Sequence, residues 1–139
     1  QVFCKPIAEL TEAQVTLVPI DDRSSGVKSV YVPLSSSKLL VVESRRANAK
    51  FDCEGTGTST STWRARNGVI VYTADMTLGH GEGFQALVAP ASRGLQTLPS
   101  CSAPPQYDAI LGVGDAVVMN GVRVRVLSSG LYDTVEISK

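Results

Sequence analysis

The chain has 139 residues, and its 13 Lys and Arg balance its 13 Asp and Glu, so the formal net charge is zero. This balance argues against a dedicated nucleic-acid binder, because phosphate binding draws its affinity from excess positive charge. Hydrophobic residues make up 43% of the chain, which excludes a disordered polar tail, and no apolar run approaches the roughly 20 residues that a membrane span needs.

Short runs rich in β-branched residues follow one another along the chain, and turn residues separate them. We expect about eight or nine short strands, which is typical of an all-β, antiparallel β-sandwich. The runs predicted as strands are 14–20, 27–32, 38–45, 69–74, 84–89, 114–119, 122–126 and 134–138. Helical signal is weak, and residues 7–13 are the only segment with room for a turn or two of helix.

Three local patterns sharpen this prediction. Residues 38–45 begin with apolar side chains on both faces, which predicts a central strand. Asn120-Gly121 stands between two strand-like runs, and this dipeptide favours a tight hairpin turn. Pro19 and Pro33 place their strands at a sheet edge or near a strand end, because proline has no N–H to donate.

The length predicts a single β-sandwich domain spanning residues 1–139. The chain starts at Gln1 and shows no secretory signal segment. Two interpretations fit: a mature protein after signal cleavage, or a fragment or C-terminal domain of a larger secreted protein. We favour the second, because Val2-Phe3-Cys4 resembles the continuation of an earlier element.

Three cysteines, Cys4, Cys53 and Cys101, give an odd count. We expect a disulfide between Cys53 and Cys101, since both lie in loop-like segments, and such a bridge contributes roughly 4 kcal/mol by closing a long loop. This pairing favours a secreted or extracellular protein. Two alternatives stay open: three free thiols in the cytosol, or a Cys4–Cys101 pair. No C-x-x-C pair exists, which excludes a zinc ribbon.

Each catalytic template lacks a part. His80 is the single histidine, so a two-histidine metal site is excluded, and no G-x-S-x-G motif accompanies it. We interpret His80 as an exposed turn residue between glycines. A small hydrolase built on His80 is the weakest of the functions considered, and the prediction is that this chain is not an enzyme.

The acidic residues allow a weak calcium hypothesis. Asp75 ends a predicted strand and Glu82 lies in the glycine-rich turn after it, while Asp52 and Glu54 flank a Ser/Thr loop. Carboxylates on sandwich loops can hold calcium. The alternative is that these are solvated surface acids, and no other cofactor is expected.

Charged and aromatic residues in the middle of the chain suggest either a structural or a binding role. Glu43 and Arg45 share one face of a strand, with Arg46 next to them, which favours a half-buried ion pair that ends a sheet. Trp63 and Tyr72 are the candidates for stacking on a sugar. The low aromatic content of 6% weakens a glycan-binding role.

The same middle segment resembles a known family. An apolar strand ending in Glu43-x-Arg45 precedes Phe51-Asp52, and a glycine-initiated strand ending in Asp75 follows. This order resembles the β-rich region that follows the catalytic domain of immune-inhibitor-A-type secreted metallopeptidases. Residues 115–126 are similar to the end of the family's bacterial members. Lys50 departs from the family's glycine before Phe-Asp.

The resemblance implies an accessory domain rather than a peptidase, because the zinc-binding helix is missing from this chain. We therefore expect a non-catalytic accessory β-sandwich domain that supports structure, positions substrate or provides attachment. Its partner would be an upstream peptidase-like domain or another extracellular protein. The alternative is a stand-alone extracellular protein- or glycan-binding module.

Overall fold

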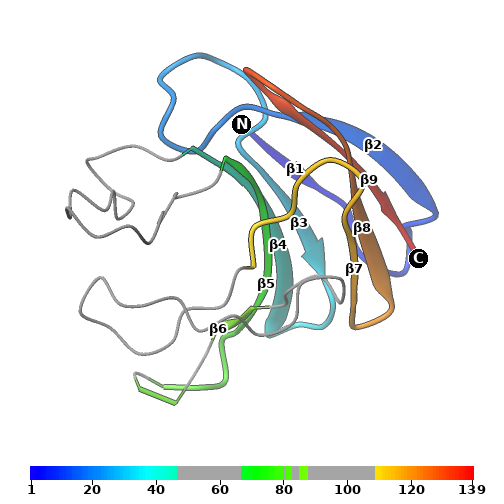
Figure 1. Cartoon of the computed structure of the whole chain (residues 1–139). Coiled ribbons are helices and arrows are strands. Elements are labelled where there is room, and N and C mark those ends of the chain that lie inside the picture. Colours follow the sequence, from blue (N-terminus) through cyan, green and yellow to red (C-terminus); the bar gives the residue numbers. More distant parts are fainter. Residues whose placement is uncertain (47–66, 80, 83–84, 88–108) are drawn as a thin grey trace, which may run out of the picture.

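The computed structural model describes residues 1–46, 67–79, 81–82, 85–87 and 109–139. These residues form strands, turns and connecting segments and contain no helix. The strands build two sheets that face each other as two layers (Figure 1). The predicted all-β, mostly antiparallel sandwich is confirmed.

Nine strands make up the described part of the sandwich. They are β1 (Val2–Cys4), β2 (Glu12–Leu17), β3 (Ser29–Pro33), β4 (Lys38–Arg45), β5 (Gly68–Asp75), β6 (Gln85–Leu87), β7 (Ala116–Met119), β8 (Val122–Ser129) and β9 (Asp133–Ser138).

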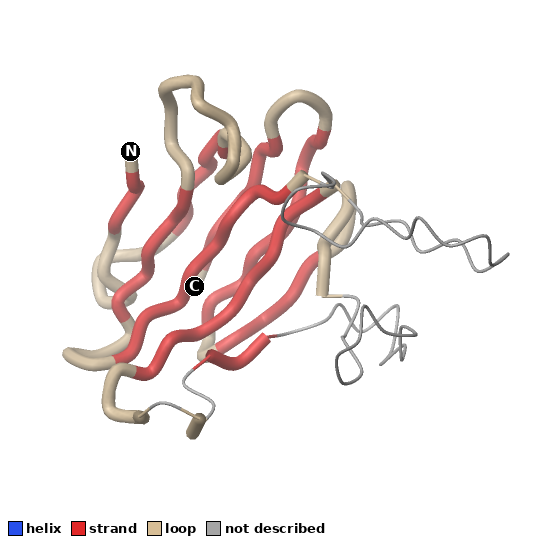
Figure 2. The backbone as a smooth tube through the Cα atoms, turned by 90° about the vertical axis from the view of Figure 1, so that its left-hand side faces the viewer, coloured by secondary structure: helices blue, strands red, loops and turns tan. Residues whose placement is uncertain are grey.

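The larger sheet has five strands in the order β1-β3-β4-β5-β6, and the smaller sheet has four in the order β2-β9-β8-β7. Neighbouring strands are antiparallel except for β1 and β3, which run parallel. Figure 2 looks onto the larger sheet, with the N-terminus at one margin. The prediction that residues 38–45 form a central strand is confirmed, because β4 lies between β3 and β5.

The core lies between the two sheets and consists mainly of valine. Its fully buried members come from both layers, and each large aliphatic side chain removed from water contributes roughly 1.5–3 kcal/mol. They include Leu17, Val30, Val32, Leu40, Val42, Val69, Val71, Leu111, Val122, Val124, Val126, Val135 and Ile137.

Strict alternation in β8 shows how the sequence selects the inner face. Val122, Val124 and Val126 are buried, whereas Arg123 and Arg125 between them are exposed. Successive side chains of a strand point to opposite faces, so a single register places the three valines in the core and the two arginines in solvent.

The hairpin predicted at Asn120-Gly121 is also confirmed. Both residues have positive φ, 52° at Asn120 and 78° at Gly121, as a type I′ turn requires. The turn joins Met119 of β7 to Val122 of β8, which are paired in register.

Two expectations near the N-terminus differ from the structure. Residues 7–9 form a turn rather than a helix, and β2 begins at Glu12 because it pairs with β9, with Glu12 opposite Ser138. Strand β1 was not predicted, because a strand of three residues has too short a pattern. It forms because the larger sheet offers β3 as a partner, with Phe3 opposite Val30.

Candidate functional site

The outer faces of the two sheets differ in chemistry. The smaller sheet carries polar groups that face solvent: the hydroxyls of Thr16 and Thr134 lie 3.2 Å apart, and Arg123 pairs with Glu136 at 3.6 Å. Such a surface is typical of a face with no further partner. The outer face of the larger sheet is different, and it is the candidate site.

One row of residues crosses all the strands of the larger sheet on this outer face. The register aligns Cys4, Tyr31, Val41, Tyr72 and Leu87 from β1, β3, β4, β5 and β6. Adjacent strands lie about 4.8 Å apart, so the backbones of the two tyrosines are about 10 Å apart with Val41 between them. We call this row the outer row.

The outer row is apolar and only partly shielded from water. The Val41 side chain points away from the core, because side chains alternate along β4 and its neighbours Leu40 and Val42 point into the core. Val41 is nevertheless only 3% exposed. At the margins the face is open, since Leu87 is 50% exposed and Val2, on β1, is 48% exposed. The face therefore combines a covered centre with accessible apolar margins.

Glu43 and Arg45 lie beside the outer row and form a charged cluster with Tyr72, a member of that row. Glu43 Oε1 accepts a hydrogen bond from the Tyr72 hydroxyl at 3.0 Å, and Glu43 Oε2 pairs with Arg45 Nη2 at 3.3 Å. The Glu43 side chain is 10% exposed and that of Arg45 is 38% exposed. The half-buried ion pair expected from Glu43 and Arg45 is confirmed.

The electrostatics of this cluster keep the Tyr72 hydroxyl protonated. Burial raises the pKa of Tyr72 to about 12, and the charge and hydrogen bond of Glu43 act in the same direction. The phenol thus stays protonated at neutral pH and donates to Glu43. Arg45 Nε is buried and makes no hydrogen bond, while the Arg45 side chain as a whole is partly exposed.

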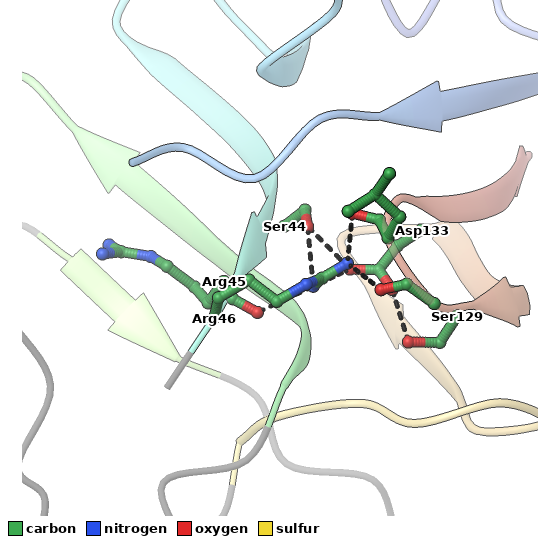
Figure 3. A network of polar contacts seen from close by, with 7 residues as sticks. Ser44, Arg45, Arg46, Ser129 and Asp133 are labelled. Carbon is green, nitrogen blue, oxygen red and sulfur yellow. Dashed lines mark hydrogen bonds and ion pairs between the residues drawn. The ribbon is translucent and has the colours of Figure 1, made fainter. Parts of the chain in front are cut away.

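A second polar cluster joins the two sheets. Asp133 is fully buried, and its carboxylate accepts 2.6 Å hydrogen bonds from Ser44 Oγ, Ser129 Oγ and Arg46 Nη1. Arg46 Nη2 also donates to the carbonyl oxygens of Gly130 and Leu131. We call the four side chains Ser44, Arg46, Ser129 and Asp133 the inter-sheet clasp; Figure 3 shows Arg45 pointing away from it.

The sequence carried a signal for this clasp that residue-by-residue reading missed. Asp133 alternates with Val135 and Ile137, so its side chain faces the core. A buried carboxylate needs a cation or several donors. Arg46 follows a strand as one more charged residue, and nothing local in the sequence connects it with Asp133.

A shallow depression adjoins the clasp and is lined in part by Pro19, Asp22, Arg46 and Leu131. Arg46 has little left to offer a ligand there, because both of its Nη groups already donate within the protein. Asp22 Oδ1 accepts from the backbone N–H of Ser24 at 2.7 Å. Arg46 and Asp22 in the wall of the depression are therefore already engaged in hydrogen bonds within the protein.

The two calcium candidates each close a local turn. Asp75 accepts hydrogen bonds from Thr77 Oγ1 at 2.6 Å and from Thr77 N at 3.0 Å, which lower the pKa of Asp75 below its ordinary value of 3.8. Glu82 Oε2 accepts from the N–H of Gly79 at 2.6 Å. Among the residues that the structure describes, no three His, Cys, Asp or Glu side chains gather as metal ligands.

Several residues singled out in the sequence lie outside the described residues: Cys53, Cys101, His80, Trp63, Phe51, Asp52 and Glu54. The predicted disulfide stays a prediction for that reason. Cys4 is an exposed free thiol at the edge of the larger sheet. Within the described ranges, no helix is long and apolar enough to cross a membrane.

Comparisons with protein-family models, with curated proteins and with solved structures give no match for this chain. The resemblance to the region that follows the catalytic domain of immune-inhibitor-A-type peptidases therefore depends on its short motifs alone. Of those motifs, Glu43 and Arg45 lie in the charged cluster on the outer face of the larger sheet.

Proposed function

We propose that this chain is a non-catalytic, extracellular accessory domain that binds a protein partner through the outer face of its larger sheet. The main support for this proposal is the difference in chemistry between the outer faces of the two sheets. The smaller sheet carries threonines and paired charges, with exposed Val118 on its edge strand. The larger sheet carries the apolar outer row, which is open at Leu87, and the neighbouring Glu43 and Arg45.

The composition of this face fits a protein interface. Tyrosine and arginine are enriched at the centres of such interfaces, where they combine apolar area with a polar end. Tyr31 and Tyr72 supply that area, and the partly accessible Arg45 supplies donors. Exposed Val2 and Leu87 extend the apolar surface to both margins of the sheet.

A glycan-binding role has less support from the same geometry. The Tyr72 hydroxyl is engaged by Glu43 and its ring is half-buried, whereas stacking on a sugar needs an open ring face. The partner that the sequence resemblance suggests is an upstream peptidase-like domain, and the resemblance is its only support.

The test uses any domain encoded upstream in the same reading frame, expressed separately and titrated against this chain by calorimetry. We expect binding that Val2→Arg or Leu87→Arg weakens at least about tenfold, because each places an unpaired charge in an apolar contact. Thr16→Arg on the opposite sheet is the matched control and should bind like the wild type.

Two results would contradict the proposal. One is binding that is equally sensitive to Thr16→Arg, and the other is the absence of binding to every domain of the same polypeptide. Circular dichroism on each variant distinguishes a lost contact from a lost fold.

A further inference from the structure

Among the strands that the structure describes, β7 is an edge strand of the smaller sheet. It follows β8 at the end of the order β2-β9-β8-β7, and it contains Ala116, Val117, Val118 and Met119. Figure 1 shows β7 beside β8 in that layer. An edge strand offers a row of backbone groups to another strand.

The hairpin register decides which backbone groups face outward. Met119 and Val122 flank the two-residue turn, so they form a hydrogen-bonded pair, and Val117 with Val124 forms the next. The N–H and C=O groups of Ala116 and Val118 therefore point away from β8. No residue of the described part of the chain pairs with them on that side.

This edge strand is short, but it lacks two of the usual protections against pairing. Proteins block edges with proline, with charged side chains or with bulges, and Ala116–Met119 contains neither proline nor charge. Val118 projects from the outer face with 64% of its surface exposed. By contrast, the opposite edge strand, β2, exposes Glu12 and Gln14.

We propose that β7 pairs with β7 of a second copy of this chain, antiparallel and around a two-fold axis at Val117. Ala116 of each copy then faces Val118 of the other, and each such pair exchanges both of its N–H···O=C hydrogen bonds. The smaller sheets of the two copies become one continuous sheet, in which the β7 edge of each copy is paired.

The sizes of the side chains across the two-fold axis suit self-pairing. The small Ala116 side chain lies opposite the larger Val118, so the outer surface of the seam packs without a clash. Asp115 precedes the seam strand, and its Oδ2 already accepts from the Gly112 N–H at 2.7 Å. Arg123 and Arg125 lie on β8 opposite Val118 and Ala116, one strand away from the seam. No like charges meet across the axis.

The contact is short, so the expected dimer is weak, with a Kd on the order of 1 mM or somewhat below. Sedimentation velocity on the full chain, from micromolar to millimolar concentration, measures it. We expect the weight-average sedimentation coefficient to rise with concentration, and the amide signals of Ala116 and Val118 to shift in parallel in NMR spectra.

Two substitutions isolate the seam without removing a contact inside one copy. Val118→Pro deletes an outward N–H that β8 does not use, and we expect the Kd to rise about tenfold or more. Val118→Glu places a carboxylate opposite Arg123, its register partner within the copy, yet brings two carboxylates to about 7–8 Å across the axis. It should abolish association.

Val113→Glu is the matched control, because Val113 is 62% exposed but lies before β7. This variant should associate like the wild type. The inference is overturned if sedimentation of the wild type is independent of concentration up to millimolar levels. It is equally overturned if folded Val118→Pro and Val118→Glu associate like the wild type, or if Leu87→Arg on the other sheet abolishes association.

Discussion

The inter-sheet clasp predicts a large loss of stability from a single substitution. Arg46→Met removes the cation that pairs with the fully buried Asp133 at 2.6 Å and leaves the carboxylate with only its two serine donors. Breaking a buried ion pair on one side costs about 3–5 kcal/mol, because the remaining charge stays desolvated. For a domain of this size, that loss lowers the Tm by roughly 10–20 °C.

Urea denaturation followed by far-UV circular dichroism measures this effect. The internal control is Arg123→Met, which breaks the solvent-exposed pair with Glu136 at 3.6 Å and should cost less than about 1 kcal/mol. The double variant Arg46→Met/Asp133→Leu should be more stable than the sum of the single losses predicts, because it removes both charges together. The reasoning is refuted if Arg46→Met costs no more than Arg123→Met.

Two further predictions concern single residues. Tyr72 should titrate near pH 12 in an ultraviolet absorbance titration, and Glu43→Gln should lower the pKa of Tyr72. Because the pKa of Tyr72 is raised in the folded state, the contribution of Tyr72 to stability is present below about pH 10 and is lost as the pH rises through about 12. Gly68→Ala should destabilise the fold by about 1–3 kcal/mol in urea melts, because a Cβ there would lie 2.4 Å from the Leu111 carbonyl oxygen. Gly130→Ala, where a Cβ meets nothing within 4 Å, is the control, and equal losses at both glycines would contradict the steric argument.

The elements that sequence patterns predicted well are those whose signal is local. Val122, Val124 and Val126 alternate with two arginines, and this pattern alone assigns the buried face of β8. Asn120-Gly121 defines its turn because few residues tolerate positive φ at two consecutive positions. Strand β4 was expected to be central because both of its faces are apolar, and β3 and β5 flank it.

Predictions were weaker where a strand depends on its partner. Strand β1 has three residues and forms only because β3 lies beside it, and β2 starts earlier than its own pattern indicates because β9 extends alongside. In both cases the backbone hydrogen bonds come from residues distant in the sequence, which a local pattern does not contain.

The amino-acid sequence by itself determined the strand-rich architecture, the tight hairpin and the ion pair of Glu43 with Arg45, because alternation and spacing within one strand are local properties. Only the tertiary structure decided that Arg46 reaches Asp133 across the sandwich, that Tyr31 and Tyr72 flank Val41 in one row, and that β7 comes last in the order of the described strands of its sheet. These juxtapositions follow from strand order, and strand order results from packing two sheets around a shared core rather than from any one segment.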